Sequence, residues 1–313
     1  GERRLTALSV VKSKISRHGK LPLKRYEDVA DHAKAVYNNI IRREGGSAGM
    51  AATEYVLMNQ DIPVLDFTCR RNEFDEPEFF EGTWHVDYRP IGYRGLAAFL
   101  EHRKAPKHRE HIRQLLEQYG CDDLEGFLQV TRALSLNDTF WVKRQGEVLQ
   151  WRDVSLYTNP FSEVISEAAF DGTVSETDFS STSPEFGTDG YYAKCWIREE
   201  SGIKLYKSGS AFLEIEPLSE FLASQLAEGI CRQAVLYDLD YYHGKLISKC
   251  PLFTSETVGL AKASAVFHGA EHTIPDLLQY FRGIGSEDAF RRMCILDAII
   301  LNPDRHYGNF GVL

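Results

Sequence analysis

The feature that most constrains this chain is a polar loop near its end, set between an apolar helix and an apolar strand. The helix is expected to begin near Ser286, because the acids that follow suit the positive end of the helix dipole. It carries apolar residues as far as Leu301, and Pro303 then disfavours further helix. Residues 302–309 form the loop. So many specific polar residues between two apolar elements are typical of a functional site, and a plain polar connection is the alternative.

The spacing of two polar residues in this loop points to phosphoryl transfer. That reaction needs a carboxylate to orient the attacking hydroxyl or accept its proton, and a nearby oxygen to hold Mg²⁺ against the phosphates. Protein kinases place the two as Asp and Asn with four residues between them. Asp304 and Asn309 have this spacing.

A lysine and a glutamate upstream fit the same chemistry. Strands are expected at 193–198 and 203–207, followed by a helix over 216–227. Lys207 would end the second strand and Glu220 would lie on the helix, the order in which kinases place the pair that positions nucleotide phosphates. Two surface charges would explain the pattern as well. The apolar helix face expected to point at the core consists of Leu218, Phe221, Leu222, Gln225 and Leu226.

The segment before these strands is a hydroxyl-rich loop, residues 176–190, with glycines at 187 and 190. Small residues let backbone N–H groups approach a phosphate closely. The sequence has neither the GxxxxGK[ST] nor the GxGxxG pattern, so an ordinary hairpin loop is the alternative reading. With few apolar anchors, we expect this loop to be mobile without nucleotide.

The middle of the chain predicts several further elements. Strands are expected at 62–67 and 84–88, and helices at 95–103 and 109–119. Residues 140–143 and 148–151 are expected to pair as a hairpin. The His, Lys and Arg residues between 102 and 111 are interpreted as a solvated loop rather than as a phosphate patch or a metal site.

The first residues carry an unusual charge. Residues 1–25 have a net charge of +7, although the whole chain has −9. A basic arm can grip phosphates, but a solvated end is the commoner case, and the net charge argues against a protein that coats nucleic acid. Residues 24–43 have the apolar spacing of an amphipathic helix whose role the sequence does not indicate.

Composition limits the class of protein. Hydrophobic residues make up 43% and charged residues 26%, as in ordinary globular chains, and no apolar run is long enough to span a membrane. The six cysteines form no CxxC pair, so we expect reduced thiols and a cytoplasmic protein. The chain starts at Gly1, which favours a fragment or a processed protein.

Together these segments resemble the HipA-like serine/threonine kinases, a family of bacterial toxin kinases and their relatives. The loop 302–309 matches the family pattern N-x-D-R-H-x-x-N, and residues 194–220 resemble its strand lysine and the first helix of its N-lobe. The resemblance covers about residues 60–313. It implies an α+β, kinase-like bilobal fold, with ATP bound between the lobes and Mg²⁺ as cofactor.

The resemblance also implies roles for individual residues. Asp304 would be the catalytic base, Asn309 a Mg²⁺ ligand, and Lys207 a phosphate contact paired with Glu220. Residues 247–251 would be the hinge that meets adenine, and the nucleotide-binding set would include Lys249 and His306. In the family a loop serine can be autophosphorylated, which ejects the loop and switches off activity. The matching loop here offers Ser180, Ser181, Thr182 and Ser183, of which Ser181, Thr182 and Ser183 are the candidates.

The expected organisation has four parts. Residues 1–60 are the basic arm and amphipathic helix, 61–175 an α/β subdomain, 176–250 the kinase-like N-lobe, and 251–313 the start of a helical C-lobe. The family has a second metal-binding Asp after the catalytic loop. Because the sequence stops at Leu313 before such a residue, we expect a truncated C-lobe and an incomplete metal site, so this length could be inactive.

The predicted function is therefore ATP- and Mg²⁺-dependent transfer of phosphate to a Ser or Thr of a protein substrate, with an antitoxin-type partner protein as a further expectation. Two alternatives stay open. Phosphoinositide kinases share a similar DRHxxN motif, so the acceptor could be a lipid or a small molecule. A nucleotide-binding pseudokinase, or a regulatory module that acts through the basic arm, is the reading without catalysis.

Overall fold

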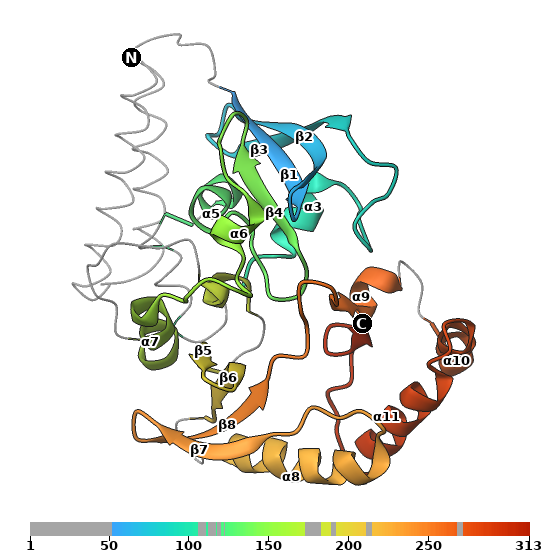
Figure 1. Cartoon of the computed structure of the whole chain (residues 1–313). Coiled ribbons are helices and arrows are strands. Elements are labelled where there is room, and N and C mark those ends of the chain that lie inside the picture. Colours follow the sequence, from blue (N-terminus) through green and yellow to red (C-terminus); the bar gives the residue numbers. More distant parts are fainter. Residues whose placement is uncertain are drawn as a thin grey trace, which may run out of the picture. The chain divides into compact units, whose positions relative to one another are not determined.

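Helices and antiparallel sheets occur together in the described part of the chain (Figure 1). The computed structural model describes residues 52–105, 111, 117, 120–121, 123–172, 183–188, 192–210, 215–267 and 272–313. The predicted α+β class is confirmed. The predictions for the basic arm and the helix 24–43 lie outside the described residues, as does most of the predicted helix 109–119.

The chain divides into two units, residues 1–51 and 52–313. Our predicted boundary after residue 60 falls inside the hairpin formed by β1 (Thr53–Asn59) and β2 (Ile62–Arg71), so that boundary is wrong. The two strands are antiparallel partners along their whole length, and a domain boundary between them would break every hydrogen bond of the ladder.

The first sheet has the order β3-β2-β1-β4, with β3 at Pro77–Trp84 and β4 at Phe140–Arg144. Alternate residues of β2, namely Leu65, Phe67 and Cys69, are buried, as expected for a strand with one covered face. The core beside it is completed by Leu100 of α3 (Leu96–Glu101) and Phe127 of α5 (Leu124–Thr131). The predicted strand 62–67 and the predicted helix 95–103 are thus confirmed.

The second sheet has the order β5-β6-β8-β7, all antiparallel. Its strands are β5 (Lys194–Glu199), β6 (Gly202–Ser208), β7 (Asp238–Tyr242) and β8 (Lys245–Pro251). One side of the sheet buries Cys195, Tyr206 and Ile247 against Phe170 of α7 (Glu163–Asp171). The predicted strands at 193–198 and 203–207 are confirmed.

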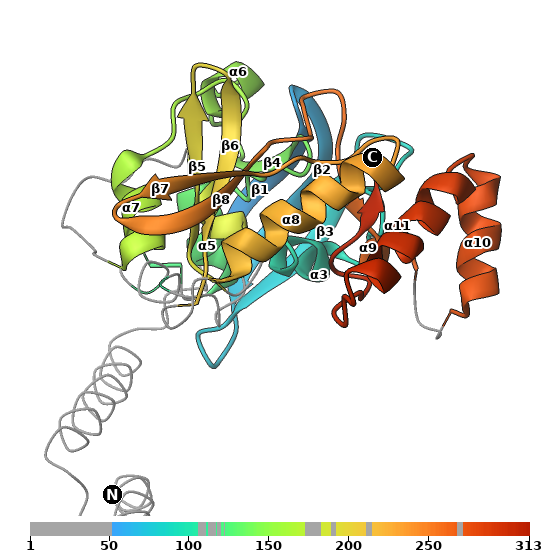
Figure 2. The ribbon, with the colours of Figure 1, turned by 90° about the horizontal axis from the view of Figure 1, so that it is seen from below.

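Helix α8 (Ile215–Ile230) lies across the second sheet and contacts β6, β7 and β8, as the view from below shows (Figure 2). The helix is confirmed, but the predicted buried face is wrong. The buried residues are Pro217, Ser224 and Ala227, whereas Leu222 is 60% exposed. Small residues let the helix approach the sheet closely, and the hydroxyl oxygen of Ser224 accepts a hydrogen bond from the Tyr237 amide at 3.1 Å.

The last part of the chain carries a small helical cluster and a two-stranded sheet. Its helices are α9 (Ala263–Val266), α10 (Ile274–Gly283) and α11 (Glu287–Ile299), and its strands are β9 (Ala261–Lys262) and β10 (Gly311–Val312). Phe281 of α10 stacks on Phe290 of α11, with ring centroids 4.6 Å apart. The polar loop 302–309 therefore lies between α11 and β10, as the sequence predicts.

Two predicted strands are wrong. No strand forms over 84–88, because β3 ends at Trp84 and the His85 side chain turns back to contact the Asp66 carboxylate at 2.9 Å. Residues 148–151 do not pair with β4, whose partner is β1. Trp151 instead begins the short helix α6 (Trp151–Val154). In both cases a long-range contact wins over the local alternation of the sequence.

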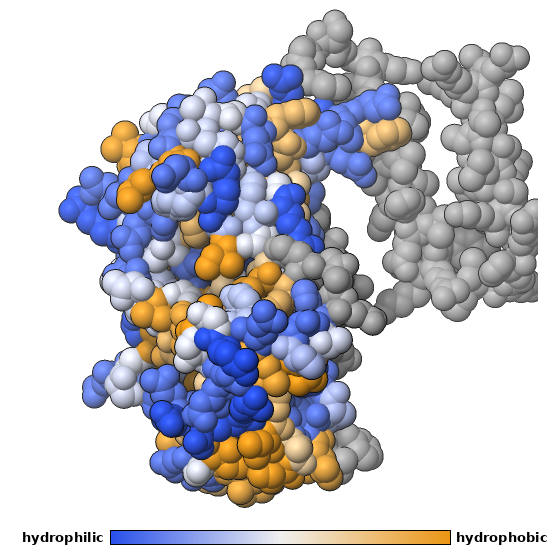
Figure 3. Space-filling view, turned by 90° about the vertical axis from the view of Figure 1, so that its right-hand side faces the viewer, coloured by the Kyte–Doolittle hydropathy of each residue, from blue (hydrophilic) through white to orange (hydrophobic). Residues whose placement is uncertain are grey.

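Large apolar side chains remain exposed on the helices of the second half. Figure 3, seen from the side of α10 and α11, shows apolar side chains gathered along its lower end. The exposed apolar residues of α8 and α11 include Leu218, Leu226, Ile295 and Ile299. Among the described residues, none of the helices combines the length and the apolar character needed to cross a membrane.

Candidate functional site

Lys207 and Glu220 form the ion pair that the sequence predicts. The Lys207 Nζ lies 2.7 Å from Glu220 Oε1 and 2.9 Å from the Tyr237 hydroxyl. The second carboxylate oxygen of Glu220 accepts a hydrogen bond from the Ser248 hydroxyl, and Ser248 is fully buried in β8. Strand β6, helix α8 and strand β8 thus each supply one group, so the position of the lysine depends on how the helix packs on the sheet.

The charge of Lys207 is stabilised by these neighbours. Burial alone would lower the pKa of Lys207, but Tyr237 and Glu220 together raise it above its ordinary value. Burial also raises the pKa of Tyr237 to about 12, although Lys207 opposes that change. At neutral pH the lysine is therefore an ammonium beside a neutral phenol, a suitable contact for an anion.

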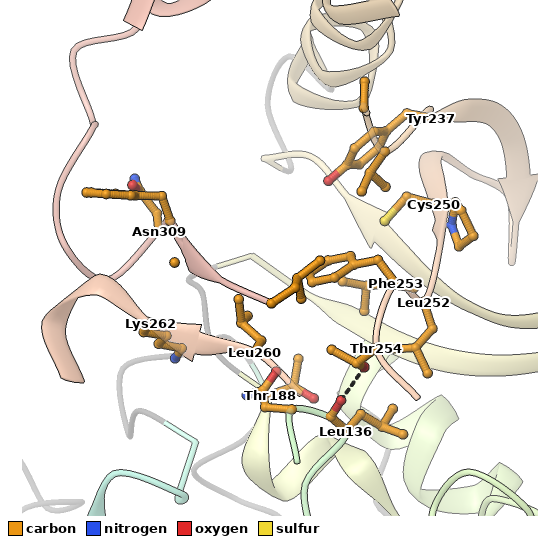
Figure 4. A pocket seen from close by; sticks show the side chains of 18 of the residues that line it. Leu136, Thr188, Tyr237, Cys250, Leu252, Phe253, Thr254, Leu260, Lys262 and Asn309 are labelled. Atoms are coloured by element: carbon orange, nitrogen blue, oxygen red, sulfur yellow. Dashed lines mark hydrogen bonds between the residues drawn. The ribbon is translucent and has the colours of Figure 1, made fainter. Parts of the chain in front are cut away.

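A cavity of about 980 Å³ opens beside this ion pair (Figure 4). Lys207 lines it, together with Leu205 of the same strand. Residues 250–254, which leave β8, line a second side, and Asn309 with residues 308–311 lines a third. The hydroxyl of Thr254 donates to the carbonyl of Leu136, which ties the 250–254 segment to the connection between α5 and β4. The cavity is therefore bounded by residues that lie far apart in the sequence.

The predicted hinge contributes only in part. Of residues 247–251, Cys250 and Pro251 line the cavity, and the lining continues to Thr254. Lys249 does not line it: its Nζ lies 2.7 Å from Asp240 Oδ2 and 3.7 Å from Glu199 Oε1. Because alternate residues of a strand face opposite sides of a sheet, Lys249 points away from the cavity that Cys250 lines. The interpretation of Lys249 as a nucleotide contact is wrong for this cavity.

The loop 302–309 is braced by an ion pair that the sequence analysis missed. Arg305 makes two bonds of 2.7 Å to the carboxylate of Asp297, which lies on α11. The side chain of Asn302 donates to the same carboxylate at 2.8 Å. In the sequence, Asp297 simply interrupts the apolar residues of the helix. An acid in the last turn of the helix, eight residues before a loop arginine, is the signal that could have identified the brace.

Asn309 and Asp304 occupy different positions relative to the cavity. Asn309 lines it, and its side-chain amide donates to the backbone carbonyl of Asp304. The Asp304 side chain is 81% exposed and is not among the lining residues. His306 also lies outside the lining; its Nδ1 accepts from the Gly308 amide at 3.0 Å and its Nε2 is 3.9 Å from Asp304 Oδ1. The structure brings Lys207 and Asn309 to one cavity, but Asp304 is not among the residues that line it.

The loop that precedes β5 is described only in part. Ser181 and Thr182 lie outside the described residues. Ser183 is 3% exposed, and its hydroxyl donates to the buried carboxylate of Glu185 at 2.5 Å. Glu185 also accepts from the Trp196 amide at 2.9 Å, so the short 3₁₀-helix η1 (Pro184–Gly187) is packed. Residues 183–188 are therefore packed, while residues 176–182 and 189–190 of the loop predicted to be mobile lie outside the described residues. A buried Ser183 would have to be released before it could be modified.

Metal ligands are sparse in the described residues. There, no three His, Cys, Asp or Glu side chains lie together so as to hold a metal ion. Mg²⁺ commonly takes one or two protein oxygens and completes its shell with substrate phosphates and water. Asn309 Oδ1, which accepts from the His306 amide at 3.2 Å, and the exposed Asp304 carboxylate are oxygens of the kind that Mg²⁺ binds.

Comparison with known proteins adds no family. No family model matches this chain, and no curated protein matches it.

Proposed function

We propose that this chain is an ATP- and Mg²⁺-dependent kinase of the HipA-like group that phosphorylates a Ser or Thr of a protein. One observation carries the proposal: Lys207, paired with Glu220, lines the same cavity as Asn309 and the 250–254 segment. Three parts of a phosphoryl-transfer site, far apart in sequence, thus converge on one space of nucleotide size.

In this proposal the second sheet and α8 are the N-lobe of a kinase-like bilobal fold. Helices α10 and α11 and the loop 302–309 then begin the C-lobe. The base of the nucleotide lies against residues 250–254, and its phosphates extend past Lys207 towards Asn309. All six cysteines are free thiols, which agrees with the reducing cytoplasm in which we place the protein.

The chemistry follows from these positions. The acceptor hydroxyl oxygen attacks the γ-phosphorus, the bond from that phosphorus to the β,γ-bridging oxygen breaks, and ADP leaves. Asp304 orients the hydroxyl and takes its proton, which then passes to water. Asn309 would hold Mg²⁺ together with the phosphates, and the bound ion would supply positive charge to the transferred group. The ion pair of Arg305 and Asp297 keeps the loop in place, so that Asp304 and Asn309 hold their positions relative to each other.

The test is transfer of labelled γ-phosphate from ATP to protein, with Asp304→Asn as the main variant. The amide keeps the size of the side chain but cannot take a proton, so we expect transfer to fall by roughly a hundredfold or more. Asp238→Asn is the matched control, because Asp238 is exposed on β7 and does not line the cavity. Undiminished transfer by Asp304→Asn would refute the assigned role.

One observation favours a second candidate, a module that binds nucleotide without transferring phosphate. Asp304 is largely exposed and stands outside the cavity, and Glu228 is the sole acidic residue among its lining residues in the described part of the chain. Such a module would bind MgATP but transfer no label to protein. Label found on a phosphoinositide or a small alcohol instead would favour the lipid or small-molecule alternative.

A further inference from the structure

The cavity is lined by an excess of positive side chains. Among its described lining residues are Lys194, Lys207, Arg232 and Lys262, against one carboxylate, that of Glu228. Arg232 contributes least to the charge inside the cavity, because its side chain is 80% exposed and lies 3.3 Å from Asp288. The three lysines therefore define the charge of the interior.

Two of these lysines lie side by side on neighbouring strands of the second sheet. Lys194 of β5 and Lys207 of β6 are directly opposite partners in the antiparallel ladder, and both line the cavity. Like charges directly opposite in a sheet are destabilising. Glu220 forms an ion pair with Lys207. An arrangement of this kind suits a ligand with several negative charges.

Lys262 comes from a different element and lies on the other side of the cavity. In β9 it pairs with Gly311 of β10, and the amide of the next residue, Ala263, donates to the Phe310 carbonyl at 2.8 Å. These bonds hold Lys262 beside the segment that carries Asn309. Figure 4 shows Lys262 and Asn309 on one side of the cavity, across from Tyr237 and Cys250.

The position of Lys262 is built into the backbone. A Cβ added to Gly311 would lie 2.2 Å from the carbonyl oxygen of Ala261, so only glycine permits this strand spacing. Burial lowers the pKa of Lys262, because few waters solvate its ammonium group. A negatively charged ligand in the cavity would favour the ammonium form again.

We propose that Lys262 contacts the terminal phosphates of a bound nucleoside triphosphate, opposite Lys207, and so makes the cavity select triphosphates over monophosphates. The inference rests on the proposed function for the orientation of the ligand. With the base against residues 250–254 and the chain of phosphates running past Lys207 to Asn309, the distal phosphates arrive at Lys262. A monophosphate in the same orientation ends near Lys207.

The experiment measures the affinities of the full chain for MgATP, MgADP and AMP by calorimetry. Lys262→Met should weaken MgATP binding by roughly tenfold to a hundredfold, the range for loss of a hydrogen bond between charged groups. AMP binding should not change, and Lys262→Arg should keep most of the MgATP affinity. Lys143→Met is the control, because Lys143 contacts the Leu149 carbonyl at 3.3 Å and does not line the cavity. Unfolding curves check that each variant folds.

A second readout uses the proton. At alkaline pH, MgATP binding to the unmodified chain should take up a proton, seen as a dependence of the binding heat on the buffer, and Lys262→Met should lose this uptake. Equal MgATP affinity of Lys262→Met and the unmodified chain, or an equal loss for AMP, would overturn the inference. MgATP binding that depends on Lys262 without phosphate transfer would refute the kinase alone. No MgATP binding at all would refute both.

Discussion

Glu220→Gln should destabilise the protein by an amount that the structure bounds. The substitution keeps the volume of the side chain but removes the charge that faces the Lys207 Nζ at 2.7 Å. Loss of one partner costs about 3–5 kcal/mol for a fully buried ion pair and at most about 1 kcal/mol for an exposed one. Lys207 is 19% exposed and Glu220 35%, so this pair lies between the two limits. We expect a loss of roughly 1–3 kcal/mol.

The assay is thermal unfolding followed by circular dichroism, with Tm expected to fall by roughly 3–9 °C for a unit of this size. The pKa of Lys207 is raised in the folded state, so its stabilising effect is complete below the unfolded-state pKa of about 10.4 and is lost as the pH rises through the folded-state pKa. The difference in Tm should therefore stay constant from about pH 6 to about pH 10 and shrink above that range.

Glu228→Gln is the matched control, because Glu228 is exposed on the same helix and no ion pair to it is found among the described residues. Its Tm should stay within about 1–2 °C of the unmodified chain. If Glu220→Gln unfolds at the same temperature as the unmodified chain throughout that pH range, the argument that this pair anchors α8 to the sheet is wrong.

Three other substitutions test the remaining structure. Asp297→Asn weakens the brace on Arg305, so phosphate transfer should fall by roughly tenfold with a Tm change of only a few degrees; an unchanged rate would show that the loop needs no brace. Lys249→Met should leave MgATP affinity within about twofold, as measured by calorimetry, because the side chain faces away from the cavity; a tenfold loss would restore the hinge interpretation of Lys249. A hydrogen bond from Tyr206, together with nearby lysines, lowers the pKa of Glu199 to about 2, so its stabilisation is present above the unfolded-state value of about 4.3 and is lost as the pH falls towards about 2. Urea unfolding midpoints should therefore decline less over that interval in Glu199→Gln than in the unmodified chain, and parallel curves would contradict the assignment.

Several parts of the site could be predicted from sequence because they depend on local chemistry. The lysine at the end of β6 and the glutamate early in α8 were read from the order of strand, turn and helix, and their ion pair follows once the helix packs on the sheet. Pro303 and the run of apolar residues before it placed the end of α11 and the start of the loop. Each of these features depends on residues that lie within about one helix or strand of each other in the sequence.

The face that α8 buries could not be read in the same way. Its leucines have the spacing of a core stripe, yet Ser224 and Ala227 face the sheet. Helical periodicity identifies an apolar face but does not say which neighbour covers it. The hairpin predicted at 140–151 is wrong for the same reason, namely a neighbour that is distant in sequence. Strand β4 pairs with β1, which lies far from it along the chain.

By itself, the sequence determined the α+β class, the strands and helix that carry Lys207 and Glu220, and the polar loop with Asp304 and Asn309, because periodicity, turn residues and spacing are local properties. Only the tertiary structure decided which side chains share the cavity. Lys262 lines the cavity because β9 pairs with β10. Lys249 does not line the cavity, because it lies on the other face of β8. Both outcomes depend on contacts between residues far apart in the chain, and no local pattern encodes the register or the side on which such contacts form.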